Sequence, residues 1–329
     1  MSVNNLVLDC RGVTAHYVLG NDIRVRAVDN VNLTVGRGEI VGLAGESGCG
    51  KTTLMRTIYR DVTPPLRVLS GVVRLQATSG EMVDLYSLSE AKLREMRAKV
   101  ISYIPQGSMS VLNPTSRIRG QFLEIFQKYG GVKKEEALQQ VKDRLRELGL
   151  RESILNSYPH QLSGGMRQRT VIALATIMNP SIVLADEPTS ALDVVYQRGV
   201  VEMIQKIREM YGTSFILVSH DMGLHYQVTD RIALMYAGKI IEVGKTDDVF
   251  KEPLHPYTEG LINSLPRIGG SKRLEGLSGL PPSLANPPPG CRFHPRCPYR
   301  MEKCSREEPP LLKFGDREVA CWLLEEGKK

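Results

Sequence analysis

Long hydrophobic runs are missing from this sequence, in which no stretch of 18 consecutive apolar residues occurs. A helix needs about 20 such residues to cross a bilayer, so the sequence predicts no membrane-spanning helix. The opening segment, MSVNNLVLDCRG, also lacks the basic segment followed by an apolar one that is typical of a secretory signal. We therefore expect no signal peptide.

Cysteine pairs of the C-x2-C kind are absent as well, although the chain has six cysteines. Common zinc sites use such pairs. Without a secretion signal, disulfides are not expected either, because they persist mainly in oxidising compartments. The cysteines are therefore interpreted as free thiols, metal ligands or cluster ligands.

The charge balance excludes little. The formal net charge is +7 and charged residues make up 24% of the chain, which is ordinary for a globular protein. A solvated surface is the simplest interpretation, and a nucleotide, an acidic partner or an anionic membrane face would also suit it. The hydrophobic content of 42% over 329 residues is enough for a large core in one to three domains.

Short β-branched runs recur along the chain and alternate in part with helical patterns. In residues 194–210, for example, Val200, Ile204, Ile207 and Met210 recur near helical spacing. Strands that alternate with helices favour an α/β fold with a parallel sheet covered on both faces. The predicted strands lie in LVLDCRGVTAHYV, VNLTV, EIVGLAG, VISYIP, SIVLAD, SFILVSH and RIALMYAGKIIEVG.

The strand signal stops between about Ser108 and Met178, where GQFLEIFQKYG and KKEEALQQVKDRLRELGL indicate helices. We interpret residues 108–178 as a helical subdomain inserted into the α/β core. After Pro266 the composition shifts to Gly, Pro and Ser, which is typical of a linker or a loop-rich region. The expected domains are thus residues 1–265 and 266–329.

The segment GLAGESGCGKTT matches G-x-x-x-x-G-K-[ST] from Gly45 to Thr52, between an apolar strand and a helix. Glycines let successive N–H groups face one anion, and the helix start adds a favourable dipole. Lys51 would reach the β- and γ-phosphates, and the Thr52 hydroxyl would bind Mg²⁺. A plain glycine-rich turn is the alternative, but the complete match in this context favours a phosphate site. The ATP-binding residues expected here are Gly45, Ser47, Gly48, Cys49, Gly50, Lys51, Thr52 and Thr53.

Acidic residues end the apolar strand of SIVLADEPTSALD. Asp186 would hold Mg²⁺, and Glu187 would polarise an attacking water as a general base. A helix cap or a surface pair is the alternative for an isolated Asp-Glu, but the phosphate loop favours catalysis. Two weaker candidates are His220, which would contact the γ-phosphate, and Gln106, which would reach Mg²⁺ or the water.

These motifs, together with QLSGGMRQR at residues 161–169, resemble the ATP-binding cassette (ABC) ATPases. The resemblance implies an α/β P-loop nucleotide-binding domain in which Ser163, Gly164 and Gly165 act on ATP held by a second subunit. Met166 departs from the usual glutamine of this motif, at a position not expected to touch phosphate. The other implied roles are the Q-loop for Gln106, the D-loop for Ser190–Asp193, the switch histidine for His220 and adenine stacking for Tyr17.

Longer segments resemble the oligopeptide/dipeptide importer ATPases: PQGSMSVLNPTSRIRGQ is similar to their Q-loop, and HPYTEGLINSLP to their C-terminal region. The resemblance implies an ATP hydrolase on the cytoplasmic face of the membrane, with ATP and Mg²⁺ as cofactors. The implied partners are a second homologous ATPase subunit, two membrane-spanning permease subunits and an extracytoplasmic solute-binding protein, with no nucleic acid. Peptides are the expected cargo, and oligosaccharides, nickel and other solutes are alternatives.

Four of the six cysteines lie in the C-terminal region with the spacing C-x5-C-x6-C-x16-C, at Cys291, Cys297, Cys304 and Cys321. Four thiolates on a proline-rich tail could hold a 4Fe–4S cluster, which the resembling ATPases carry in this region, and such a centre would order the tail. Zinc, and unligated thiols or disulfides, are the alternatives. No cysteine of this set belongs to a nucleotide motif, so we expect ATP hydrolysis to survive loss of a purely structural cluster. Cys49 lies at a helix start, which would lower its pKa and make it reactive, or it is a small filler.

Two other classes of ABC ATPase differ from this chain in their organisation. Soluble ABC ATPases that act on ribosomes carry two cassettes, whereas this chain has a single P-loop. DNA-repair ABC ATPases split the cassette with a long coiled coil, and the segment between Lys51 and Ser163 is too short for one. A nonenzymatic ATP-gated module would not need Glu187 and His220. The importer ATPase is therefore favoured.

Overall fold

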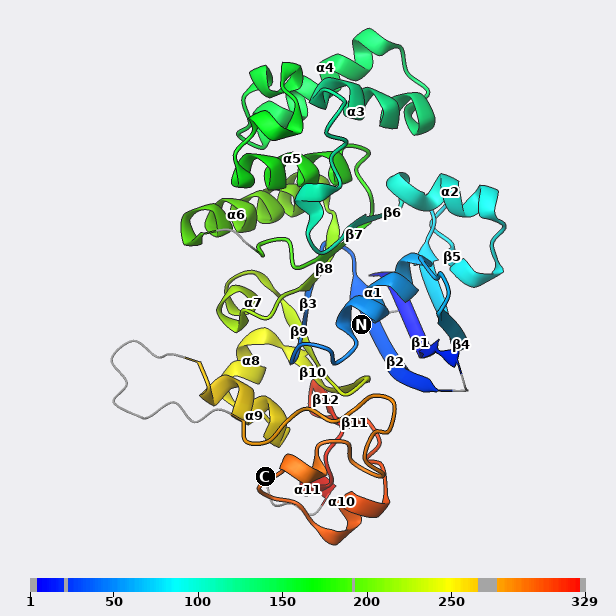
Figure 1. The fold of residues 1–329 in the computed structure, drawn as a ribbon, viewed down its shortest axis with the longest axis vertical. Helices are drawn as coiled ribbons and strands as arrows, with labels where there is room; N and C mark the ends of the chain where they lie inside the picture. Colours follow the sequence, from blue (N-terminus) through cyan, green and yellow to red (C-terminus); the bar gives the residue numbers. More distant parts are fainter. Residues whose placement is uncertain (1–4, 21–22, 191–192, 266–276, 326–329) are drawn as a thin grey trace. The chain divides into compact units, whose positions relative to one another are not determined.

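The computed structural model describes residues 5–20, 23–190, 193–265 and 277–325, and of residues 98, 194 and 195 the backbone only. The chain divides into two compact units, each built from segments that are separate in the sequence. Unit 1 comprises Met1–Asp9, Thr34–Glu39 and Arg74–Leu217. Unit 2 comprises Cys10–Leu33, Ile40–Val73 and Val218–Lys329. Figure 1 labels the helices and strands of both units.

The main sheet of unit 2 contains a strand, β3 (Ile40–Ala44), that is buried at every residue. β3 runs parallel to β9 (Arg231–Tyr236), which turns back into the antiparallel β10 (Lys239–Lys245). The short strands β12 (Arg317–Val319) and β11 (Leu312–Phe314) continue the sheet beyond β10. The apolar sequences of β3 and β9 fit this place, because strands covered on both faces need apolar residues throughout.

The helices of unit 2 lie between and after these strands along the chain, and Figure 1 labels them. They are α1 (Lys51–Tyr59), α7 (Met222–Val228), α8 (Thr246–Lys251), α9 (Pro256–Asn263), α10 (Glu302–Arg306), α11 (Trp322–Glu325) and the short 3₁₀ helix His294–Arg296. Three further strands lie largely within this unit, in the order β2 (Arg24–Gly36), β1 (Leu6–Val18) and β4 (Leu66–Gln76).

The core of unit 2 includes three fully buried aromatic rings. The ring centroids of Tyr236 on β9 and Tyr257 on α9 are 4.7 Å apart, and Phe293 lies 5.3 Å from Tyr236. Such tilted aromatic contacts stabilise a core beyond the area that they bury. Because Phe293 lies among the C-terminal cysteines, that region shares a hydrophobic core with β9 and α9.

Unit 1 carries the strands β8 (Ser214–Val218), β7 (Ile182–Asp186) and β6 (Ile101–Ile104) in that order, with β6 parallel to β7. β5 (Met82–Asp84) pairs antiparallel with the end of β4, and α2 (Glu90–Lys99) precedes β6. Residues 108–178 are all described and contain helices and loops without a strand. Their main helices are α3 (Ile118–Ile125), α4 (Lys134–Glu147) and α5 (Gly164–Thr176), followed by α6 (Val194–Tyr211). Shorter helical turns are Leu85–Ser87, Ser108–Ser110, Phe126–Gly130, Glu152–Asn156 and Pro159–Gln161.

The predicted α/β fold is confirmed. No helix among the described residues is both long and apolar enough to span a membrane. The loop-rich interpretation of the C-terminal region missed the hairpin β11–β12, whose residue Val319 pairs with Glu242 of β10. Strands of three residues carry too little alternation to be recognised. The expected domain boundary at residue 265 adjoins residues 266–276, which lie outside the described residues, so it stays a prediction.

Candidate active site

The glycine-rich loop of unit 2 connects β3 to α1, as predicted. Gly45 and Gly50 adopt φ angles of 148° and 113°, which L side chains rarely adopt. A Cβ at Gly45 would lie 2.1 Å from the Met235 carbonyl oxygen, and one at Gly50 would lie 1.9 Å from that of Ala27. Both positions therefore require glycine, because neighbouring backbone approaches the loop from β9 and β2.

Lys51 opens α1 and folds back over this loop. Its ammonium donates hydrogen bonds to the carbonyl oxygens of Gly45 at 2.8 Å and Glu46 at 2.9 Å. The side chain is buried, so the charge is largely shielded from solvent. The loop and the start of α1 thus place a cation beside a series of backbone N–H groups, an arrangement that suits an anion.

Tyr17 and Thr53 lie beside each other at the first turn of α1, with their hydroxyl oxygens 3.2 Å apart. The predicted stacking residue is therefore next to the phosphate loop.

The predicted reactivity of Cys49 is not supported by its surroundings. Burial raises the pKa of its thiol above the usual value, although Lys51 acts in the opposite direction. The position therefore fits a small filler and not a reactive thiolate.

His220 is exposed and follows β8. The backbone next to it is held by a second histidine, His225. The ring of His225, on α7, is fully buried, and its Nε2 donates to the Ser219 carbonyl oxygen at 3.1 Å. Its Nδ1 faces Gly42 of β3, where an added Cβ would lie 2.6 Å away. Sequence reasoning missed His225, because nothing in the local pattern distinguishes it from a surface histidine.

His225 makes the stability of unit 2 depend on pH. Burial lowers its pKa from 6.5 to about 4. Below pH 6.5 the unfolded chain binds a proton that the folded chain excludes until about pH 4, so stability falls through this window. From these pKa values we expect acidification from pH 7 to pH 5 to lower the free energy of unfolding by about 2 kcal/mol through His225.

Chemical unfolding of the wild type and of His225→Gln at both pH values measures this contribution. The pH dependence of the wild type should exceed that of His225→Gln by this amount. His160→Gln, at an exposed histidine of unit 1, is the control and should titrate like the wild type. Equal pH dependence in the wild type and His225→Gln would show that His225 is not held neutral.

The acidic pair of unit 1 lies at the end of β7. Asp186 is fully buried, and its Oδ2 accepts a hydrogen bond from the Tyr103 hydroxyl at 3.3 Å. Glu187 has a φ of 50°, an uncommon conformation for a residue with a side chain. Its Oε2 accepts a hydrogen bond from the side-chain amide of Gln106 at 3.0 Å. The structure thus brings together Gln106 and Glu187, two candidates from different strand ends.

The SGG segment of unit 1 forms the start of α5. Ser163 is the N-cap, and its hydroxyl accepts a hydrogen bond from the Met166 amide at 3.3 Å. A Cβ at Gly165 would lie 2.3 Å from the Tyr196 ring, so the glycine allows α6 to pack closely. The helix also contacts the Q-loop, because Ser108 donates a hydrogen bond to the buried Gln168 at 2.9 Å.

The predicted D-loop is described at its two ends only, since residues 191–192 lie outside the described residues. The Ser190 hydroxyl donates to the Glu187 carbonyl oxygen at 2.9 Å, and the Asp193 side chain accepts from the Tyr196 amide at 3.1 Å. Asp193 therefore caps the start of α6.

The candidate residues are divided between the two units. Unit 2 contains Tyr17, Gly45, Ser47, Gly48, Cys49, Gly50, Lys51, Thr52, Thr53 and His220, and unit 1 contains Gln106, Ser163, Gly164, Gly165, Asp186, Glu187 and Asp193.

The four C-terminal cysteines form no disulfide, and Cys297, Cys304 and Cys321 lie near Cys291. The Cys291 amide donates to the Cys304 carbonyl oxygen at 2.8 Å. The pKa of Cys291 is raised to about 12, mainly by burial and in the same direction by the nearby Cys304, Cys321 and Cys297. Among the described residues, however, no group of three or more His, Cys, Asp or Glu is arranged to hold a metal ion. The predicted 4Fe–4S site is therefore not borne out by this geometry.

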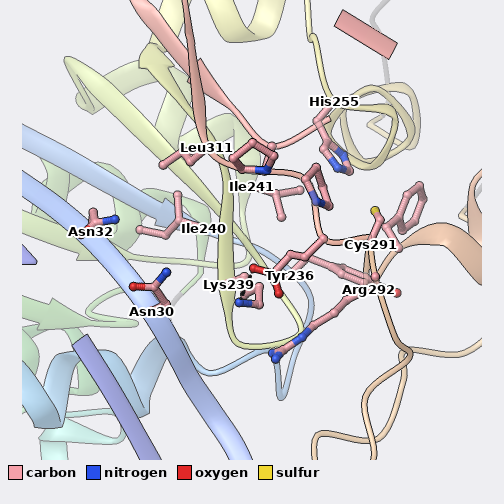
Figure 2. A pocket seen from close by; sticks show the side chains of 16 residues that line it. Asn30, Asn32, Tyr236, Lys239, Ile240, Ile241, His255, Cys291, Arg292 and Leu311 are labelled. Carbon is pink, nitrogen blue, oxygen red and sulfur yellow. Dashed lines mark ion pairs between the residues drawn. The ribbon is translucent and has the colours of Figure 1, made fainter. Parts of the chain in front are cut away.

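A pocket of about 220 Å³ separates this cysteine segment from β10 (Figure 2). Cys291 and Arg292 line one side, and Asn30, Lys239 and Ile240 line the other. Arg292 donates to the Ala237 carbonyl oxygen and forms an ion pair with Asp29 of β2. These contacts fasten the C-terminal region to the strands of unit 2.

Two family descriptions match the chain: "ABC transporter" over residues 28–190, and "Oligopeptide/dipeptide transporter, C-terminal region" over residues 241–304. The chain is 38% identical to the dipeptide transport ATP-binding protein DppD of Caldanaerobacter subterraneus subsp. tengcongensis, covering 100% of this chain and 99% of that protein. It is 41% identical to the oligopeptide transport ATP-binding protein AppD of Bacillus subtilis, covering 92% of each.

A similar solved structure is the dimeric ATP-binding cassette MJ0796, bound to ADP and Pi in a post-hydrolysis state. Its TM-score is 0.63 at 29% sequence identity, and the alignment covers 73% of this chain and 98% of that one.

Proposed function

This chain belongs to the ABC transporter ATPases of the oligopeptide/dipeptide type, and from that membership we propose that it hydrolyses ATP to drive peptide import. The observation that carries the proposal is the full-length similarity to a dipeptide transport subunit, which includes the C-terminal region as well as the cassette. Transport of a labelled peptide into vesicles that contain the complete importer, dependent on ATP and on this subunit, tests it. Uptake of oligosaccharides in place of peptides would support the alternative cargo.

We assign the nucleotide chemistry to the residues singled out in the sequence. Lys51 and the N–H groups of the glycine-rich loop would hold the phosphates, and Tyr17 would stack on adenine. Thr52, Gln106 and Asp186 would hold Mg²⁺, which would neutralise charge on the phosphates during transfer. The buried Asp186 carboxylate at a strand end suits a hard cation.

The proposed base is Glu187, whose carboxylate would accept the proton of the attacking water. Its hydrogen bond from Gln106 supports this role, because it fixes the direction in which the carboxylate points. His220 would stabilise the γ-phosphate from the end of β8. Hydrolysis would thus use a held phosphate and an oriented carboxylate.

We propose that a second ATPase subunit completes each site through the SGG segment. The Ser163 cap and the α5 helix start support this proposal, because such a start offers N–H groups to an anion. The similar cassette MJ0796 is itself a dimer. We infer that the partner here is a homologous subunit and not a second copy, which subunit mixing with and without that partner would test.

The long Q-loop is the surface that we assign to the permease subunits. Val111 lies beside a structured turn of this loop and is 58% exposed, so its apolar side chain is available to a partner. The turn is held by the Gln121 carboxamide, which accepts from the Asn113 amide and donates to the Asn113 and Ser116 carbonyl oxygens. A rigid loop with an exposed apolar tip suits a helix of a membrane partner. This contact would place the chain on the cytoplasmic face of the membrane. On the opposite face, a solute-binding protein would deliver cargo to the permease.

We propose that Cys291, Cys297, Cys304 and Cys321 hold a 4Fe–4S cluster. A cubane joins each thiolate to a different iron, so its cysteines stand further apart than the ligands of a single ion. The electrostatic proximity of the other three thiols to Cys291 supports the proposal. When bound, the cluster would order a region that is poor in regular structure.

Protein purified without oxygen should carry about four irons and four sulfides per chain. Replacing any one of the four cysteines with Ser should remove or degrade the cluster and make residues 292–322 sensitive to protease, whereas Cys10→Ser on β1 should change neither. Iron and sulfide analysis, absorbance and limited proteolysis measure these effects. One zinc and no iron would indicate a zinc site instead of the cluster. Absence of both metals would contradict the proposed cluster.

A further inference from the structure

The residue that follows the first glycine of the P-loop is held by the C-terminal region. Arg296, just before Cys297, forms two parallel hydrogen bonds with the Glu46 carboxylate, at 2.8 and 2.9 Å. The Arg296 side chain is only 6% exposed, and such bidentate pairs fix geometry as well as charge. The two residues are 250 positions apart in the sequence.

A second C-terminal residue binds the backbone of Glu46. The Glu46 amide donates to the hydroxyl of Tyr257, on α9, at 2.8 Å. Tyr257 is fully buried in the aromatic core that includes Phe293. Its hydroxyl is therefore held in one place by packing, and the Glu46 amide is held with it.

The third polar group of Glu46, its carbonyl oxygen, accepts a hydrogen bond from the Lys51 ammonium at 2.9 Å. All three polar groups of this residue are thus engaged: two of them with the C-terminal region and the third with the phosphate-binding lysine. Loss of the Tyr257 hydroxyl would release the Gly45–Glu46 peptide unit, and loss of Arg296 would release the Glu46 side chain. The Lys51 ammonium binds the carbonyl oxygens of both Gly45 and Glu46, so either change would disturb its position.

The chain just before the cysteines reinforces this contact. Arg296 also donates to the Ser278 carbonyl oxygen at 2.9 Å, and the Leu284 carbonyl accepts from the Arg26 amide at 2.8 Å. Pro281 and Pro282 lie between these two anchors and line a cavity of about 320 Å³ together with P-loop residues 46–49. Proline limits the backbone freedom of this segment, so the anchors hold it close to the loop.

We propose that Arg296 and Tyr257 are positioning residues for ATP binding, which act by fixing Glu46 and, through it, Lys51 and the P-loop. The inference rests on the proposed ATPase function. It also gives a reason to expect that disrupting the cysteine segment weakens ATP binding, in contrast to the independence that sequence separation suggested.

The test compares ATP affinity in full-length variants by fluorescent-nucleotide displacement with Mg²⁺ present. Arg296→Met and Tyr257→Phe should each raise the Kd for ATP about tenfold, because each removes a hydrogen bond that fixes the loop. The KM of the assembled ATPase should rise similarly, with kcat changed much less. Arg296→Lys keeps the charge but not the bidentate contact and should recover part of the affinity.

The matched control is Arg292→Met, in the same segment. Arg292 pairs with Asp29 with the same side-chain exposures, 6% and 23%, as the Arg296–Glu46 pair, but its partners are Asp29 of β2 and the Ala237 carbonyl oxygen. Arg292→Met should lower the melting temperature as Arg296→Met does, and it should leave the Kd for ATP unchanged. In a Glu46→Gln background, Arg296→Met should add little to the loss of affinity.

Equal Kd increases in Arg292→Met and Arg296→Met would show that Arg296 only fastens the C-terminal region, and would overturn the inference. Wild-type Kd in Arg296→Met and Tyr257→Phe would also overturn it. Should Arg296→Met fail to fold, Arg296→Lys and Tyr257→Phe, which are the milder changes, decide the question. Failure of the wild-type protein itself to bind ATP would instead reject the proposed function.

Discussion

Glu187→Gln should lower the rate of ATP hydrolysis about 10²–10⁴-fold while ATP binding is retained, because it removes the proposed general base without changing the shape of the side chain. The amide oxygen of the new glutamine can still accept the hydrogen bond that Gln106 donates to Oε2 in the wild type. Local geometry is therefore preserved, and the loss of rate isolates the loss of the carboxylate charge. The variant should also accumulate a closed complex with its partner ATPase in the presence of Mg-ATP.

The measurement is phosphate release by the assembled importer, with ATP binding followed separately. Glu202→Gln, which removes an exposed carboxylate on α6, should keep the wild-type rate. Wild-type turnover in Glu187→Gln would move the base to another group, with His220 the first candidate. A loss of binding together with turnover would indicate a structural role for Glu187, since a base acts only after ATP is held.

Lys51→Ala should weaken ATP binding about 10²-fold or more, and hydrolysis should disappear with it. Loss of a buried charge from a paired site costs about 2–5 kcal/mol, and each 1.4 kcal/mol is a factor of ten in affinity. Two effects combine here. The phosphates would lose their cation, and the carbonyl oxygens of Gly45 and Glu46 would lose the ammonium that holds them together.

Lys51→Met distinguishes loss of the charge from the effect of an empty space, because the methionine side chain fills the volume of the lysine stem without carrying a charge. It should bind ATP as poorly as Lys51→Ala. Lys245→Ala, at an exposed ion pair that ends β10, is the control and should bind ATP normally. Unchanged ATP affinity in both Lys51 variants would remove the phosphate-binding role from the glycine-rich loop.

The sequence predicted the strands that are buried on both faces, and it also predicted β1, whose burial is less regular. β3, β7 and β8 are buried at every residue, and continuous apolar runs of this kind are visible without knowledge of neighbours. β4 was missed, because its burial is irregular along LRVLSGVVRLQ and no clean alternation results. α2 was missed for a related reason: its sequence, EAKLREMRAK, is mostly polar and shows little apolar periodicity.

The sequence by itself determined the candidate motifs and the family resemblance. A glycine-rich loop, a capped helix start at Ser163 and an acidic strand end at Asp186 are local structures, each dictated by a few adjacent residues. A short sequence segment is therefore enough to predict their chemistry. Gly45 and Gly50 are clear cases, because the conformations that the structure assigns to them are those that glycine adopts most readily.

Only the tertiary structure decided what supports those motifs. Arg296 and Glu46 each look like an ordinary surface charge in the sequence, yet folding buries the arginine and joins it to a partner 250 positions away. His225 likewise becomes a buried neutral histidine only when β3 and α7 pack together. Burial and ion pairing depend on which distant segments meet, and a local pattern does not encode that. The sequence therefore revealed the residues proposed to contact ATP, and the fold revealed the residues that hold them in place.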